Sequence, residues 1–123
     1  KMKYSIVDDF DNETQIEDKI NVTVENGYAR QTALGTDGQI TSIASTMPED
    51  ISQVEARTAG QSLNATRLEI SADDGAHYTV VTPLSMVTLE ADRVGRQVKY
   101  RVTLTDSSTN VLPLLDGVSF LCK

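Results

Sequence analysis

Short segments in which apolar and polar residues alternate are the feature that most constrains the fold of this chain. In the clearest segment, residues 97–105, Val98, Tyr100, Val102 and Leu104 alternate with polar or charged side chains. Successive side chains of a β-strand point to opposite faces, so this pattern predicts a strand with one buried and one solvated face. Helical periodicity is nearly absent from the chain. An antiparallel sheet is the structure that half-buried strands of this kind form.

Turn signals separate the alternating segments. Asn-Gly or Asp-Gly pairs stand at 26–27, 37–38 and 74–75, and such pairs readily adopt left-handed backbone. We expect a hairpin around 74–75 between strands at 67–71 and 78–82. Further expected features are strands at 4–7, 20–24, 28–34, 40–45, 51–59, 87–89 and 118–120, a polar turn at 106–110, and a helical turn within 47–54 after Pro48. Eight to ten short strands without a linker or a repeat predict one antiparallel β-sandwich of jelly-roll type over residues 1–123.

The charge and the single cysteine disfavour several classes of function. A formal net charge of −7 lacks the clustered Lys and Arg that nucleic acids and anionic membrane surfaces require. No apolar segment approaches the length of a transmembrane helix, so membrane insertion is not expected. Cys122 is the only cysteine, which excludes an intrachain disulfide, and its apolar surroundings predict a buried thiol. We therefore expect no nucleic-acid partner and no cysteine-based metal site.

The sequence predicts a protein that is not an enzyme. His77 is the only histidine, and it follows the tip of the expected hairpin, where a solvent-facing turn residue is the favoured interpretation. No serine lies in a Gly-x-Ser-x-Gly context. Pairs of acidic residues could serve a glycosidase, but 18 acidic residues would satisfy any spacing, so such pairs are uninformative. A hydrolase is therefore less favoured than the two binding or structural roles described below.

An acidic cluster near the start of the chain suggests a structural calcium ion, the one cofactor we consider. Asp8, Asp9 and Asp11 lie within four residues, and Ca²⁺ prefers carboxylate and carbonyl oxygens gathered from a loop. Asp116 would approach this cluster if the first and last strands meet. The spacing differs from that of an EF-hand loop, and a solvated acidic loop without a metal is the alternative.

Glycan binding is the main functional hypothesis that the residues themselves raise. Carbohydrate-binding sandwiches stack sugar rings on exposed aromatic side chains and add polar contacts. Tyr100 and Phe120 are in phase with the expected core, so we expect them to be packed inside. Tyr28 and Tyr78 are the candidate platforms, and Arg30 lies two residues from Tyr28. These tyrosines could instead simply close the edge of the core.

The segment 71–78, Ser-Ala-Asp-Asp-Gly-Ala-His-Tyr, resembles a hairpin of β-sandwich modules in tail, fibre and baseplate proteins of tailed bacteriophages. Those modules often read Ser-x-Asp-Gly-Gly-x-x-Trp, so Asp74 and Tyr78 are departures from the pattern. The chain is also similar to these modules at Gly95 and the long alternating strand, at the polar residues 106–110, at Pro113 and at the opening Asp8-Asp9-Phe10.

The resemblance implies a galactose-binding-like jelly roll on the surface of a virion. Such a module would contact neighbouring virion subunits, associate as a homotrimer, or touch a glycan of the host surface. We therefore expect a non-catalytic virion module, structural or adhesive. The alternative is a carbohydrate-binding module of a bacterial secreted or cell-surface protein, which measurable glycan affinity dependent on Tyr28 or Tyr78 would favour.

Overall fold

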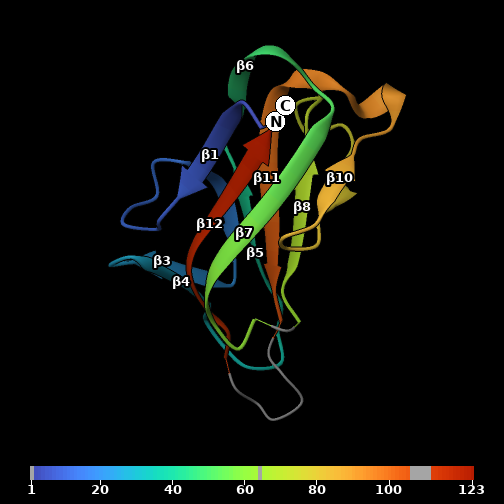
Figure 1. Ribbon diagram of the computed structural model, residues 1–123. Helices are drawn as coiled ribbons and strands as arrows, with labels where there is room; N and C mark the ends of the chain where they lie inside the picture. The colour runs from blue at the N-terminus through green and yellow to red at the C-terminus, as the bar shows by residue number, and fades with distance from the viewer. Residues whose placement is uncertain (1, 64, 106–111) are drawn as a thin grey trace.

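The computed structural model describes residues 2–63, 65–105 and 112–123, and in these residues twelve strands form two six-stranded sheets that pack together (Figure 1). The predicted all-β sandwich is confirmed. The described residues contain no α-helix, only the 3₁₀ turn η1 (Ala91–Arg93), and thus no helix long and apolar enough to cross a membrane. The turn expected at 106–110 lies outside the described residues.

The first sheet, sheet A, is built around one long strand. Its strands, in spatial order, are β10 (Met86–Thr88), β7 (Gln53–Gln61), β12 (Leu114–Cys122), β4 (Tyr28–Gln31) and β3 (Val22–Glu25), with β1 (Tyr4–Asp8) also on β12. β7 pairs along one edge of β12. The other edge is shared, because β1 pairs with the end of β12 and β4 with its beginning.

The second sheet, sheet B, has the same plan. Its strands, in spatial order, are β2 (Ile16–Ile20), β5 (Gly38–Ser42), β11 (Gly95–Leu104), β8 (Arg67–Ser71) and β9 (Thr79–Val80), with β6 (Ser45–Ile51) also on β11. All strand pairs in both sheets are antiparallel. The hairpin expected around 74–75 is confirmed, since β8 pairs with β9 and Asp74 and Gly75 have φ of 59° and 86°.

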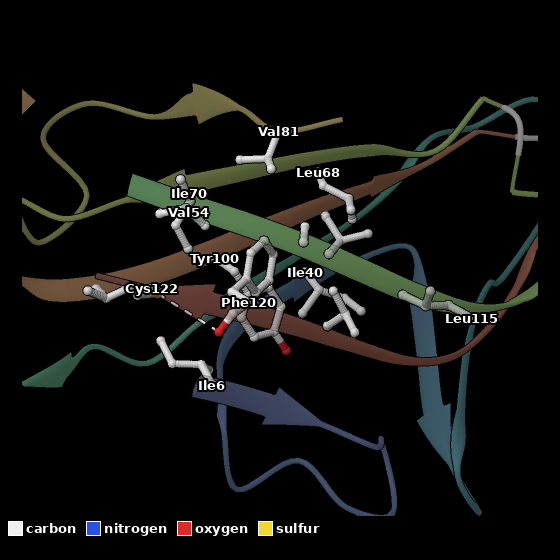
Figure 2. Packing of buried hydrophobic residues seen from close by; sticks show 14 of the residues in the cluster. Ile6, Ile40, Val54, Leu68, Ile70, Val81, Tyr100, Leu115, Phe120 and Cys122 are labelled. Carbon is white, nitrogen blue, oxygen red and sulfur yellow. Dashed lines mark hydrogen bonds between the residues drawn. The ribbon is translucent and has the colours of Figure 1, made fainter. Parts of the chain in front are cut away.

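The core lies between β11 and β12, the two central strands. Tyr100 and Phe120 are fully buried and stack with their ring centroids 5.5 Å apart (Figure 2). Cys122 is also buried, and burial raises the pKa of its thiol to about 11. Alternation therefore identified Tyr100 and Phe120 correctly as core residues, and the apolar surroundings of Cys122 predicted its burial correctly.

A buried hydrogen bond joins the two sheets across this core. The Tyr100 hydroxyl on β11 donates to Asp8 Oδ2 at the end of β1, 2.5 Å away. Asp8 is 3 % exposed, and its Oδ1 accepts the backbone N–H of Phe10 at 3.0 Å. Burial raises the pKa of Tyr100, so its hydroxyl stays protonated and remains a donor. Asp8 thus fixes where the chain turns away from β1.

Two predicted elements are wrong. The strand expected at 20–24 is interrupted at Asn21, whose φ of 53° lets the chain leave β2 in sheet B and enter β3 in sheet A. The helical turn expected after Pro48 is instead part of β6. Pro48 lies between the paired residues Thr46 and Ile51, where the missing N–H of proline costs no ladder hydrogen bond.

Candidate functional site

The outer face of sheet A carries three strands side by side, with β12 between β1 and β7 (Figure 1). Val7, Ser119 and Arg57 form one row across these strands. Their neighbours Ile6, Phe120 and Ala56 point into the core. Because side chains alternate along a strand, the row points outward.

A β-bulge on β12 sets which residues share this outer face. Leu115 and Gly117 pair with the consecutive residues Gly60 and Ala59 of β7, so Asp116 is one residue extra. Leu115 and Val118 are buried, 0 % and 3 % exposed. Residues two apart in a regular strand share a face. Because the bulge takes up Asp116, Leu115 points inward and Gly117 outward.

An open groove of about 240 Å³ lies on this face, and we call it the sheet A groove. Outward-pointing residues that line it are Val7, Asp9, Arg57, Ala59, Gly117 and Ser119. β1 ends directly beside Gly117, since a Cβ placed there would lie 3.4 Å from the Asp8 carbonyl oxygen and 3.9 Å from Asp9 Cα. The small residues of β7 and β12 form the floor of a shallow depression.

The sheet A groove combines apolar surface with hydrogen-bonding groups. Val7 is 56 % exposed and supplies apolar surface at one side of the groove. The Arg57 side chain is 59 % exposed, and Glu55 is its ion-pair partner at 3.6 Å. A long, exposed pair of this kind leaves most guanidinium donors to solvent. Asp9 is exposed and adds acceptor oxygens at the opposite side.

Two of the three residues predicted to bind glycan lie on the same face as the groove. Leu115 points inward, so its neighbour Leu114 and the paired residue Arg30 point outward. Tyr28 lies two residues before Arg30 on β4 and therefore points to the same face. Both side chains are half-buried. The turn before Tyr28 contacts the acidic loop after β1, because Gly27 donates its N–H to the Phe10 carbonyl at 3.2 Å.

The third predicted residue, Tyr78, lies elsewhere, next to sheet B. The Arg101 guanidinium covers its ring, 3.9 Å from the centroid. Arg101 is itself held by two hydrogen bonds to Glu69, at 2.9 and 3.1 Å. Burial raises the pKa of the Tyr78 hydroxyl. Only the ring face opposite Arg101 could receive a sugar. Because Tyr78 lies next to sheet B and Tyr28 and Arg30 lie on sheet A, the three residues do not form one site.

The acidic residues suggested for calcium do not form a metal cluster in the structure. Across residues 2–63, 65–105 and 112–123, no three His, Cys, Asp or Glu side chains are arranged to hold a metal ion. Asp8 is committed to Tyr100 and Phe10, and Asp9 Oδ1 accepts the backbone N–H of Asp11 at 3.2 Å. Asp116 is the exposed bulge residue. Calcium binding by Asp8, Asp9, Asp11 and Asp116 stays a prediction.

His77 belongs to a polar network that holds the hairpin turn. Its Nδ1 lies 2.6 Å from Asp73 Oδ2, and the Ser71 hydroxyl donates to Asp73 Oδ1 at 2.7 Å. Ser71 also accepts the N–H of Gly75 at 2.9 Å. Burial raises the pKa of Asp73, but the hydrogen bonds from His77 and Ser71 outweigh it and lower that pKa to about 2. The carboxylate stands between serine and histidine, which is not the order of a nucleophilic triad.

Apart from Asp9, which was considered for calcium, the residues of the groove were not singled out by the sequence analysis. The groove draws on three strands that are distant in the sequence, with Val7 on β1, Arg57 and Ala59 on β7, and Ser119 on β12. Each is an outward residue of an alternating segment. Their pairing depends on sheet topology, which the pattern alone does not provide.

A β-sandwich serves many unrelated functions, so the fold alone assigns none. No protein-family model and no curated protein sequence matches the chain. Among solved structures, a low-affinity xylan-binding module, CBM86, from the gut symbiont Roseburia intestinalis is similar, with 15 % sequence identity over 98 % of this chain and 97 % of that one, and a TM-score of 0.48. The virion interpretation, including neighbouring subunits and a homotrimer, gains no support from these comparisons.

Proposed function

We propose that this domain is a non-catalytic module that binds a neutral carbohydrate chain in the sheet A groove. The observation that carries the proposal is the groove itself, an exposed depression whose small-residue floor lies between Val7, Asp9 and Arg57. The alternative stated from the sequence, a carbohydrate-binding module, therefore becomes the leading hypothesis.

The groove offers both kinds of contact that a sugar ring makes. The C–H faces of a pyranose are apolar and would pack on Val7, Ala59 and Gly117, releasing water from that surface. Its hydroxyls both donate and accept hydrogen bonds. Arg57 supplies donors, Asp9 supplies acceptors, and the Ser119 hydroxyl can do either.

The charges favour a neutral glycan over an anionic one. The chain carries a formal net charge of −7, which repels a polyanion at long range. Close to the groove, Glu55 and Asp9 balance the positive charge of Arg57. Binding should therefore depend only weakly on ionic strength.

A module with this function would act outside the cell, on a secreted or cell-surface protein. Location on a virion surface is compatible with the same groove if the glycan belongs to a host. The virion origin stays a hypothesis, for which a particle partner or a trimer would be the supporting result.

The experiment is affinity electrophoresis of the purified domain in gels that contain neutral polysaccharides: xylan, mixed-linkage β-glucan, galactomannan and soluble starch. The domain should be retarded by at least one of them. Ala59→Leu should abolish the retardation, because an exposed leucine there fills the groove from its floor. Thr88→Leu is the matched control, since Thr88 is exposed on β10 at the far edge of the same sheet.

Equal retardation of Ala59→Leu and the unsubstituted domain would exclude the groove as the site. No retardation by any polysaccharide of the panel would overturn the proposal and return the structural virion role to first place. Circular dichroism spectra of both variants should match that of the parent, which checks that the fold is kept.

A further inference from the structure

We infer that the ligand is a stretch of several sugar units within a longer chain, which extends from the sheet A groove over Leu114 to Tyr28 and Arg30. This inference rests on the proposed function and adds the size of the ligand and a second group of contacts. We call Tyr28, Arg30 and Leu114 the β4 platform.

The register of sheet A places the groove and the β4 platform on one continuous surface. Arg57 and Gln61 are four residues apart on β7, and Gln61 pairs with Leu114, which pairs with Arg30. Four residues of strand extend roughly 13 Å, and β7 and β4 are two strand spacings apart, about 10 Å. Arg57 and Arg30 are therefore separated by roughly 16 Å, which one or two sugar units cannot span.

The loop after β1 connects the two ends of this surface. Asp9 lines the groove, and a Cβ placed on Gly27 would lie 4.0 Å from the Asp9 carbonyl oxygen and 3.3 Å from Asp11 Oδ1. Tyr28 follows Gly27 directly. A chain that leaves the groove past Asp9 would therefore pass close to Tyr28.

The electrostatic state of Arg30 also sets the β4 platform apart. On sheet B, the cations Lys99, Arg101 and Arg67 lie 2.5, 2.9 and 3.3 Å from carboxylate oxygens of Glu17 and Glu69. Arg30 forms no ion pair with another residue in the described part of the chain. Its guanidinium donors are therefore available to sugar hydroxyls beside the Tyr28 ring.

Contacts placed in a row on a sheet exterior favour the interior of a chain over its end. Each added sugar unit would gain one more set of contacts, until the chain spans both the groove and the β4 platform. A site for a terminal sugar would instead gather its contacts around one ring. Affinity should therefore rise with chain length and then level off.

The test is isothermal titration calorimetry with oligosaccharides of the polysaccharide that retards the domain, from disaccharide to hexasaccharide. Affinity should increase at least tenfold from disaccharide to tetrasaccharide and change little beyond the pentasaccharide. Tyr28→Ala should weaken hexasaccharide binding roughly three- to tenfold, the cost of an aromatic contact. The same substitution should leave disaccharide binding in the groove unchanged.

Arg30→Gln should follow the same pattern as Tyr28→Ala. Met86→Ala is the matched control, because Met86 is 54 % exposed on β10 at the opposite edge of sheet A. Equal affinity for all lengths, or equal loss at all lengths in Tyr28→Ala, would overturn the inference while the proposed function stands. Failure of every oligosaccharide and of the polysaccharide itself would overturn the proposed function instead.

Discussion

The buried hydrogen bond between Tyr100 and Asp8 gives the sharpest test of how the sandwich is held together. Tyr100→Phe removes only the hydroxyl and keeps the ring that stacks on Phe120. Asp8 is 3 % exposed and would keep the Phe10 N–H as its remaining partner. Its carboxylate would lose a charge-assisted hydrogen bond without gaining water.

A hydrogen bond to a charged group contributes about 1.5–3 kcal/mol to stability. We therefore expect Tyr100→Phe to lower the free energy of unfolding by about 2 kcal/mol, which corresponds to a fall in Tm of roughly 8 °C for a domain of this size. Urea unfolding followed by circular dichroism measures the change directly. Tyr28→Phe is the matched control, because Tyr28 is half-buried on the outer face of sheet A, and it should leave stability unchanged.

A double-mutant cycle assigns the loss to this pair. In an Asp8→Asn background, Tyr100→Phe should cost clearly less than in the parent, because the charged acceptor is gone. A loss below about 0.5 kcal/mol in the parent, or the same loss in both backgrounds, would refute the reasoning. The hydrogen bond would then contribute nothing beyond the packing of the ring.

Two further predictions concern side chains away from the groove. The pKa of Asp73 is lowered to about 2, so its contribution to stability is complete above the ordinary value of 3.8 and is lost as the pH falls toward 2; urea midpoints across this range should fall less steeply for Asp73→Asn than for the parent. Burial raises the pKa of Cys122 to about 11, so a thiol reagent at neutral pH should leave the native protein unmodified and react fully in denaturant. Rapid labelling of native Cys122 would show that the strand β12 opens locally.

The local pattern of the sequence was enough to predict the sandwich class and much of its core. Tyr100 and Phe120 are buried as predicted, because alternation along one strand reports directly which side faces inward, and Cys122 is buried as its apolar surroundings predicted. The same reasoning failed at Asn21, and the separate helix-start signal at Pro48 was wrong because Pro48 lies in the strand β6. At Asn21 the alternation continues through a residue where the chain changes sheet, and periodicity cannot distinguish a strand from two strands joined by one left-handed residue.

The candidate site was only partly accessible from the sequence. Tyr28 and Arg30 were predicted because residue type alone suggests sugar contacts, and that role stays a prediction, whereas Val7 and Ala59 are unremarkable residues in any strand. Their meaning comes from pairing, since Val7 faces Ser119 and Ala59 faces Gly117 across neighbouring strands. Tyr78 shows the converse problem, because an aromatic residue near a turn proved to be covered by Arg101.

The bulge at Asp116 sets which face each residue of β12 presents on either side of it. Leu115 before it and Val118 after it are both buried because the bulge leaves Asp116 out of the alternation between them. Asp116 is exposed, so its identity should be free to vary. Deleting it would make Leu115 and Gly117 adjacent, and they would still point inward and outward opposite Gly60 and Ala59, as in a regular strand. The chain should therefore tolerate the loss of Asp116 better than the loss of a residue between Val118 and Cys122, which would turn part of β12 over.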